Sequence, residues 1–207
     1  MNESNSIYQK YKLIEKHLDI ERLIRTAQLK ELKLYYKDIV ALVDNGYLQK
    51  IKHGYYQLVN GESDEQSEAK TIGQLYPDGV LCMNTALFYY GYSDFTPREW
   101  ELAVDRNTSK ARFHIDYPYV KPYFMEQKHL EYGVTQAEYE DCTLKIFDRD
   151  RLICEIIRNE KKMDSESYVK AIRAYAGDPK KSVLHLIDYA KKRNMLKKVK
   201  DRIGVWI

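Results

Sequence analysis

Apolar residues near the start of the chain recur at helical spacing. Ile7, Tyr11, Ile14 and Leu18 fall on one face of a helix that spans about residues 6–18. This spacing predicts a first helix that completes a three-helix core with the two helices after it.

Two short helices are predicted next. Thr26 can cap the first of them, whose inward residues are Ala27 and Leu29, and the chain then turns near residues 32–34. The second helix begins near Tyr35. Its buried face is predicted from three residues at helical spacing: Ile39, Leu42 and Val43.

A hairpin is predicted after the second short helix. Asn45-Gly46 supplies a left-handed residue that ends the helix. Residues 47–51 and 55–58 then form two strands, which turn at Lys52-His53-Gly54 because glycine allows a positive φ. Two helices followed by a two-stranded ribbon are the layout of a winged helix-turn-helix.

The side chains left outside this core are aromatic and basic. In winged helix modules the start of the second helix reads a DNA groove, and basic wing residues hold phosphates. The candidate DNA-binding residues are Tyr35, Tyr36, Lys37, Lys50, Lys52 and His53. Tyr35 is the weaker candidate because it can instead cap or pack. The alternative is a protein-docking module in which the aromatic residues are surface residues of a chain with 19 tyrosines.

A polar and acidic stretch, NGESDEQSEAK, follows the hairpin. Its Ser63 and Gln66 fit a capping box, which predicts that the linker runs into a helix through Leu75. We therefore expect a DNA-binding domain over residues 1–60, a linker over 61–69, and a second domain over 70–207.

The second domain is predicted to be mixed. Its tyrosine-rich stretch from Ile115 to Met125 contains two prolines and predicts at most an edge strand. The other expected elements are a turn at residues 77–79, strands at 80–83, 99–104 and 144–147, and a helix from Asn84 to Gly91.

The apolar period is helical from Asp148 to the end of the chain. The expected helices are one after Asp148, one capped by Asp164 or Ser165 that ends at Gly177, one that starts at Asp178-Pro179 and runs to about Arg193, and a short one with Met195, Leu196 and Val199. The predicted fold class is α+β: an N-terminal winged helix-turn-helix, then a mixed domain with a small sheet and an α-helical C-terminal part.

Composition adds limits to this picture. The chain has 207 residues, 44% hydrophobic and 31% charged, as is usual for soluble globular proteins. No apolar run approaches the ~18–20 residues of a membrane span, so we expect a cytoplasmic protein without a membrane partner. Cys82, Cys142 and Cys154 are far apart among apolar residues, which predicts buried free thiols.

The net charge of +3 is unevenly distributed. Residues 71–150 have 8 Lys/Arg against 13 Asp/Glu, whereas residues 151–207 have 15 against 7. The densest basic cluster is formed by Lys191, Lys192, Arg193, Lys197, Lys198, Lys200 and Arg202. Such a run is usually a solvated helix face, and its rival is a surface that binds a polyanion.

Candidate catalytic groups are few. Asp148 and Asp150 lie two residues apart, a spacing that sometimes holds magnesium, but a helix N-cap at Asp148 and a first-turn acid at Asp150 explain them better. Arg149 and Arg151 beside them favour salt bridges. The chain contains no acid-and-lysine set of a nuclease, no glycine-rich phosphate loop and no Ser/His/Asp set. We therefore expect no enzyme, no metal and no cofactor.

Four sequence blocks stand in a recognisable order. They are NGYLQKIKHGYYQL, YPDGVLCMNTALFYYGYSDFTP, KIFDRDRLICEIIRN, and AIRAYAGDPKKSVLHLIDYAKK with a short basic helix after it. Together they cover nearly the whole chain, which resembles the AbiEi antitoxin family of bacterial type IV toxin–antitoxin (abortive infection) systems. The junction of that family usually reads Glu-Arg-Thr, whereas here it is Asp150-Arg151-Leu152, so a role that requires the threonine hydroxyl does not carry over.

The resemblance implies two activities. The N-terminal winged helix would repress its own operon by binding inverted repeats in promoter DNA. The C-terminal domain would counter a cognate nucleotidyltransferase-like toxin without a stable complex, and the C-terminal basic cluster is its candidate antitoxicity surface. The alternative from another class is a winged-helix DNA-binding protein with a nuclease-type second domain. Metal-dependent cleavage of DNA by the protein would distinguish this alternative from an antitoxin.

Overall fold

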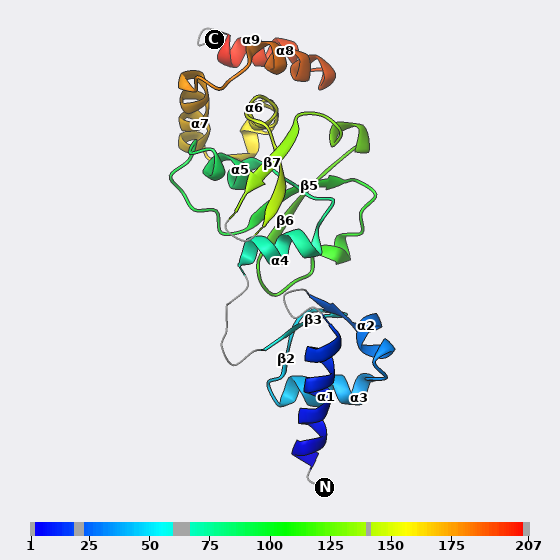
Figure 1. The fold of residues 1–207 in the computed structure, drawn as a ribbon. Coiled ribbons are helices and arrows are strands. Elements are labelled where there is room, and N and C mark those ends of the chain that lie inside the picture. The colour runs from blue at the N-terminus through cyan, green and yellow to red at the C-terminus, as the bar shows by residue number, and fades with distance from the viewer. Residues whose placement is uncertain (1–2, 19–22, 60–66, 140–141, 205–207) are drawn as a thin grey trace. The chain divides into compact units, whose positions relative to one another are not determined.

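The structure is a computed structural model that describes residues 3–18, 23–59, 67–139 and 142–204. The chain divides into two compact units: Met1–Leu75 with His114–Tyr117, and Tyr76–Phe113 with Pro118–Ile207. Each unit contains helices and its own sheet, so the fold class is α+β as predicted (Figure 1). Within the described ranges, no helix has both the length and the apolar character needed to cross a membrane.

Among the residues that the structure describes, the first unit contains four helices and a small sheet. Its elements are α1 Glu3–His17, β1 Ile24–Arg25, α2 Thr26–Glu31, α3 Tyr36–Asp44, β2 Leu48–Lys52, β3 Tyr55–Leu58 and α4 Glu68–Leu75. The sheet order is β1-β3-β2, and both pairings are antiparallel. The hairpin and the helices of this unit agree with the sequence prediction, but β1 was missed because two residues show no period.

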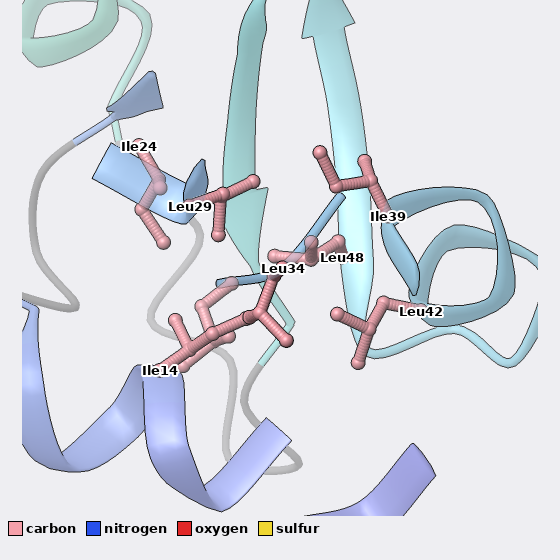
Figure 2. Packing of buried hydrophobic residues seen from close by; sticks show 8 residues of the cluster. Ile14, Ile24, Leu29, Leu34, Ile39, Leu42 and Leu48 are labelled. Atoms are coloured by element: carbon pink, nitrogen blue, oxygen red, sulfur yellow. The ribbon is translucent and has the colours of Figure 1, made fainter. Parts of the chain in front are cut away.

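Eight buried residues form the core of the first unit (Figure 2). They are Ile14, Ile24, Leu29, Leu34, Ile39, Leu42, Leu48 and Leu58. Burial of one such side chain contributes about 1.5–3 kcal/mol to the free energy of unfolding. The eight residues come from α1, α2, α3 and all three strands, as well as the turn before α3, so one set of contacts holds these elements together.

Three details of the first unit differ from the prediction. Ala27 is exposed, and Val43 is only half-buried. Arg25, not Thr26, is the N-cap of α2, because strand β1 continues to Arg25 and the Thr26 N–H donates to the carbonyl of Gly54 at 3.0 Å. Ser63 and Gln66, the predicted capping box, lie outside the described residues.

The second unit contains a five-stranded mixed sheet. Its elements are β4 Val80–Leu81, α5 Met83–Tyr89, β5 Trp100–Asp105, β6 Val120–Met125, β7 Val134–Glu138, β8 Thr143–Phe147, α6 Arg149–Arg158, α7 Ser165–Gly177, α8 Val183–Lys192 and α9 Leu196–Ile203. The strand order is β6-β5-β4-β8-β7, in which β5 pairs with β6 and β4 with β8 in parallel. The proline-containing β6 is an edge strand, as expected.

Helix starts in the second unit follow the sequence prediction in part. Asp148 and Asp164 cap α6 and α7 as predicted, each through its carboxylate. Cys82 rather than Asn84 precedes α5. Helix α8 begins after Ser182, not at Asp178, because the Asp178 carboxylate is held by the Tyr92 hydroxyl, the Arg149 guanidinium and the Lys180 N–H.

The three cysteines are free thiols. Cys82 and Cys154 are buried as predicted, and burial raises the pKa of the Cys154 thiol to about 12. Cys142 is only half-buried, so the expectation of three buried thiols was wrong for this residue.

Candidate nucleic-acid interface

The start of α3 presents aromatic and basic side chains to solvent. Tyr36 is 80% exposed, Tyr35 is 59% exposed, and Lys37 is exposed beside them. On the other face of the helix, Ile39 and Leu42 are buried in the core of the unit (Figure 2). The helix is therefore fixed by its inner face, and its first turn is free to contact a ligand.

A carboxylate and a lysine order this first turn. Asp38 Oδ2 accepts the Tyr35 N–H at 2.9 Å, which closes the start of α3. The other oxygen, Oδ1, lies 2.6 Å from Lys10 Nζ on α1. The hydrogen bond from Lys10, together with that from the Tyr35 backbone, lowers the pKa of Asp38. Lys10 thereby offsets the one negative charge in the turn that is proposed to face DNA.

The hairpin carries the second group of predicted contacts. Lys50 on β2 and His53 in the turn are exposed, whereas Lys52 is half-buried. Lys52 Nζ lies 4.8 Å from the centre of the Tyr55 ring, a distance at which a cation and an aromatic face attract each other. The Tyr55 ring thus helps to hold the side chain of Lys52 in place.

Arg25 belongs to the same hairpin surface and was not predicted. It pairs with Tyr55 across the β1–β3 ladder, and its guanidinium lies 5.8 Å from the Tyr55 ring. Arg25 and Lys52 therefore contact the same ring. The sequence places Arg25 before a helix, and only the pairing of β1 with β3 brings it to the hairpin.

The C-terminal basic cluster separates into three groups. Lys191, Lys197 and Lys200 are exposed, and in the part of the chain that the structure describes none has a carboxylate within 4 Å. Lys192 pairs with Asp188 at 2.8 Å. Lys198 and Arg202 both pair with Glu160, at 3.3 and 2.7 Å. These paired cations are less available to a polyanion.

Arg193, the remaining residue of this cluster, is not on the surface. It is 7% exposed, and its Nη2 donates to Glu155 Oε2 at 3.0 Å. Glu155 also lies 2.8 Å from the guanidinium of the fully buried Arg151, which stacks between Tyr132 and Phe147. The grouping of Arg193 with the exposed cations was therefore wrong, because its side chain serves a buried ion-pair network.

The paired aspartates at the start of α6 are occupied by protein donors. Asp148 accepts the Arg151 N–H at 2.7 Å and the Tyr189 hydroxyl at 2.8 Å. Asp150 is buried and accepts the Tyr175 hydroxyl and the Ser182 N–H, each at 2.8 Å. Burial raises the pKa of Asp150, which opposes its use as a charged metal ligand.

The described residues include no group of three or more His, Cys, Asp or Glu side chains that could hold a metal ion. The first unit presents exposed cations and aromatic rings, which are groups that can contact a nucleic acid. Comparison of this chain with protein-family models and with curated proteins gave no match.

Proposed function

We propose that the first unit binds duplex DNA as a winged helix-turn-helix. The supporting observation is the combination on one unit of an exposed aromatic and basic start of α3 with a basic hairpin. Tyr36 and Lys37 would contact base edges and backbone in the major groove, while Lys50, Lys52 and His53 hold phosphates. Arg25 joins the phosphate contacts because it shares the Tyr55 ring with Lys52.

We further propose that the protein is a type IV antitoxin that acts in the cytoplasm. In this proposal it represses its own promoter through inverted repeats, and its second unit counters a nucleotidyltransferase-like toxin without a stable complex. The support is the ordered set of four sequence blocks that resembles the AbiEi antitoxins. The exposed cations Lys191, Lys197 and Lys200 are the part of the basic cluster best suited to antitoxicity.

The DNA-binding proposal is tested with the full chain and the DNA upstream of its own gene. Gel retardation at several salt concentrations should show sequence-dependent binding that weakens as salt rises. Lys37→Ala and Lys52→Ala should each weaken binding and reduce the salt slope by about one unit per lost phosphate contact.

Lys16→Ala is the matched control, because Lys16 is an exposed lysine of α1 outside the proposed interface. It should leave both affinity and slope unchanged. Equal binding by the folded Lys37→Ala and Lys52→Ala variants and the wild type would exclude this interface. Equal affinity for unrelated DNA would exclude a promoter-specific repressor.

A further inference from the structure

A cavity of about 540 Å³ lies within the second unit. Lys121, Tyr123 and Met125 alternate along β6, so their side chains share the sheet face that lines it. Arg158 at the end of α6 and Lys162 in the turn that follows also line the cavity. The volume lies in the range of about 300–1,000 Å³ that is usual for small-molecule sites.

Positive charge dominates the lining of this cavity. The four cations that line it are Lys121, Arg158, Lys162 and Arg193. Glu155 is the only carboxylate among the lining residues that the structure describes. The cavity is therefore suited to an anion rather than to a cation.

The four cations are not equally available. Lys121 is neutralised by Glu99 at 3.2 Å and Glu101 at 3.1 Å. Arg158 and Lys162 have no carboxylate within 4 Å among the residues described. The helix dipole favours a cation at Arg158, in the last turn of α6. It does not account for Lys162, which lies beyond that helix.

The buried network behind the cavity carries an excess positive charge. Glu155 is a single carboxylate between two guanidinium groups, those of Arg151 and Arg193, and all three side chains are at most 7% exposed. Arg193 Nε is 2.8 Å from Glu155 Oε1, but it is not oriented to donate a hydrogen bond to it. A buried cation is costly without a counter-charge, and Arg193 borders the cavity, so an anion there would offset that cost.

We propose that this cavity binds a small phosphate ester. Its phosphate would lie among Arg158, Lys162 and Arg193, because guanidinium forks and ammonium groups match phosphate oxygens. Its organic part would rest against Tyr123 and Met125 on β6. The proposal is independent of DNA binding by the first unit.

The test is calorimetric titration of the full chain with four probes: AMP, ribose 5-phosphate, inorganic phosphate and adenosine. AMP should bind more tightly than inorganic phosphate, and adenosine should show no binding at the same concentrations. Ribose 5-phosphate separates the contribution of the base from that of the sugar. Binding of AMP should weaken as salt rises, because ion pairs in an open cavity are screened.

Arg158→Gln with Lys162→Gln should weaken AMP binding by about tenfold or more, since charge-assisted hydrogen bonds are lost. Arg173→Gln with Lys161→Gln is the matched control, because it removes one exposed arginine and one exposed lysine that do not line the cavity. This control should bind AMP as the wild type does. If the double variant does not fold, Lys162→Gln alone should weaken binding by a measurable factor, since Lys162 is exposed and unpaired in the described part.

Three results would overturn the proposal. The first is no heat of binding for any phosphate-bearing probe at millimolar concentration. The second is equal affinity of AMP for the wild type and for the folded cavity variant, and the third is adenosine binding as tightly as AMP.

Discussion

Single residues with a positive φ close four of the helices that the structure describes. They are Lys33, Gly46, Gly91 and Asn194, with φ values of 59°, 74°, 72° and 53°. After α2, the Leu34 N–H returns to the Leu29 carbonyl and the Lys33 N–H to the Lys30 carbonyl, each at 2.9 Å. This is the Schellman arrangement, in which glycine is the usual residue. Lys33 therefore carries backbone strain in the turn that leads into α3.

Replacing Lys33 by glycine should stabilise the protein. The left-handed conformation costs a residue with a Cβ about 1–2 kcal/mol, so Lys33→Gly should raise the free energy of unfolding by up to about 1 kcal/mol. Gly46→Ala is the opposite control, since its φ of 74° is strained for alanine although no atom lies within 4 Å of the added Cβ. It should lower the stability by about 1–2 kcal/mol. Urea denaturation measures both, and a loss of stability in Lys33→Gly would contradict the strain.

The carboxyl group of Glu160 makes the stability of the folded protein depend on pH in the acid range. Its hydrogen bond with Arg202, assisted by Lys198, lowers the pKa of the carboxyl to about 2 from an ordinary 4.5. A depressed pKa stabilises the folded state above the unfolded value, and the contribution is lost as pH falls from about 4.5 to 2. Glu160→Gln should therefore cost about 1 kcal/mol at pH 7, because its partners are largely exposed. The two proteins should converge in stability near pH 2, and an equal difference at both pH values would contradict the ion pairs.

At the scale of elements, helices α8 and α9 carry two groups of cations, one paired with a carboxylate and one not, in the part of the chain that the structure describes. Lys198 and Arg202 are held by Glu160, whereas Lys191, Lys197 and Lys200 have no carboxylate partner among the described residues. If this face binds a polyanion during antitoxicity, the second group supplies the phosphate contacts.

Reversing the charge of the second group tests this role. Lys191→Glu, Lys197→Glu and Lys200→Glu together should abolish rescue of cells that express the toxin, with only a small effect on stability because the side chains are exposed. The matched control reverses three exposed cations elsewhere in the second unit: Lys161→Glu, Arg173→Glu and Lys180→Glu. Both variants should still retard promoter DNA. Full rescue by the first variant would mean that these lysines only solvate their helices.

Elements with a clear period could be predicted from the sequence. The helices α1, α3, α6 and α7 repeat apolar residues over several turns, and the hairpin has a glycine at its turn. β1 is two residues long, and β7 pairs with β8 through the largely polar VTQAE. The start of α8 depends on Tyr92 and Arg149, which are far away in the sequence. These three features are fixed by tertiary contacts, which a local pattern does not contain.

The residues of the candidate sites also differ in how far the sequence could predict them. Exposure of Tyr36 and Lys37 follows from the helical period of α3, so the sequence could predict it. The contact of Arg25 with the hairpin and the burial of Arg193 depend on which strands and helices meet. The cavity of the second unit is lined from α5, β6, β8, α6 and the segments that follow α6 and α8, so no single stretch of sequence indicates it.

At the scale of the whole molecule, the boundary near residue 60 remains a prediction. All eight core residues of the first unit lie between Ile14 and Leu58, which favours an independently folding fragment. Contacts nevertheless group α4 with this unit, and Gln74 Oε1 accepts the Leu23 N–H at 2.5 Å. Fragments 1–60 and 1–75 therefore differ by α4, which lies outside this cluster but has buried residues of its own, among them Ile72 and Leu75.

We expect fragment 1–60 to unfold cooperatively and to retard promoter DNA, because it contains both the core and every proposed contact residue. It should be less stable than fragment 1–75 by at least the ~0.5–1.5 kcal/mol of one hydrogen bond. Circular dichroism during urea denaturation measures this difference. Leu42→Ala in either fragment is the control, because it truncates a core side chain and should lower the free energy of unfolding by about 2–5 kcal/mol. A cooperative transition in 1–75 but not in 1–60 would mean that α4 completes the DNA-binding domain, which would move the boundary to residue 75.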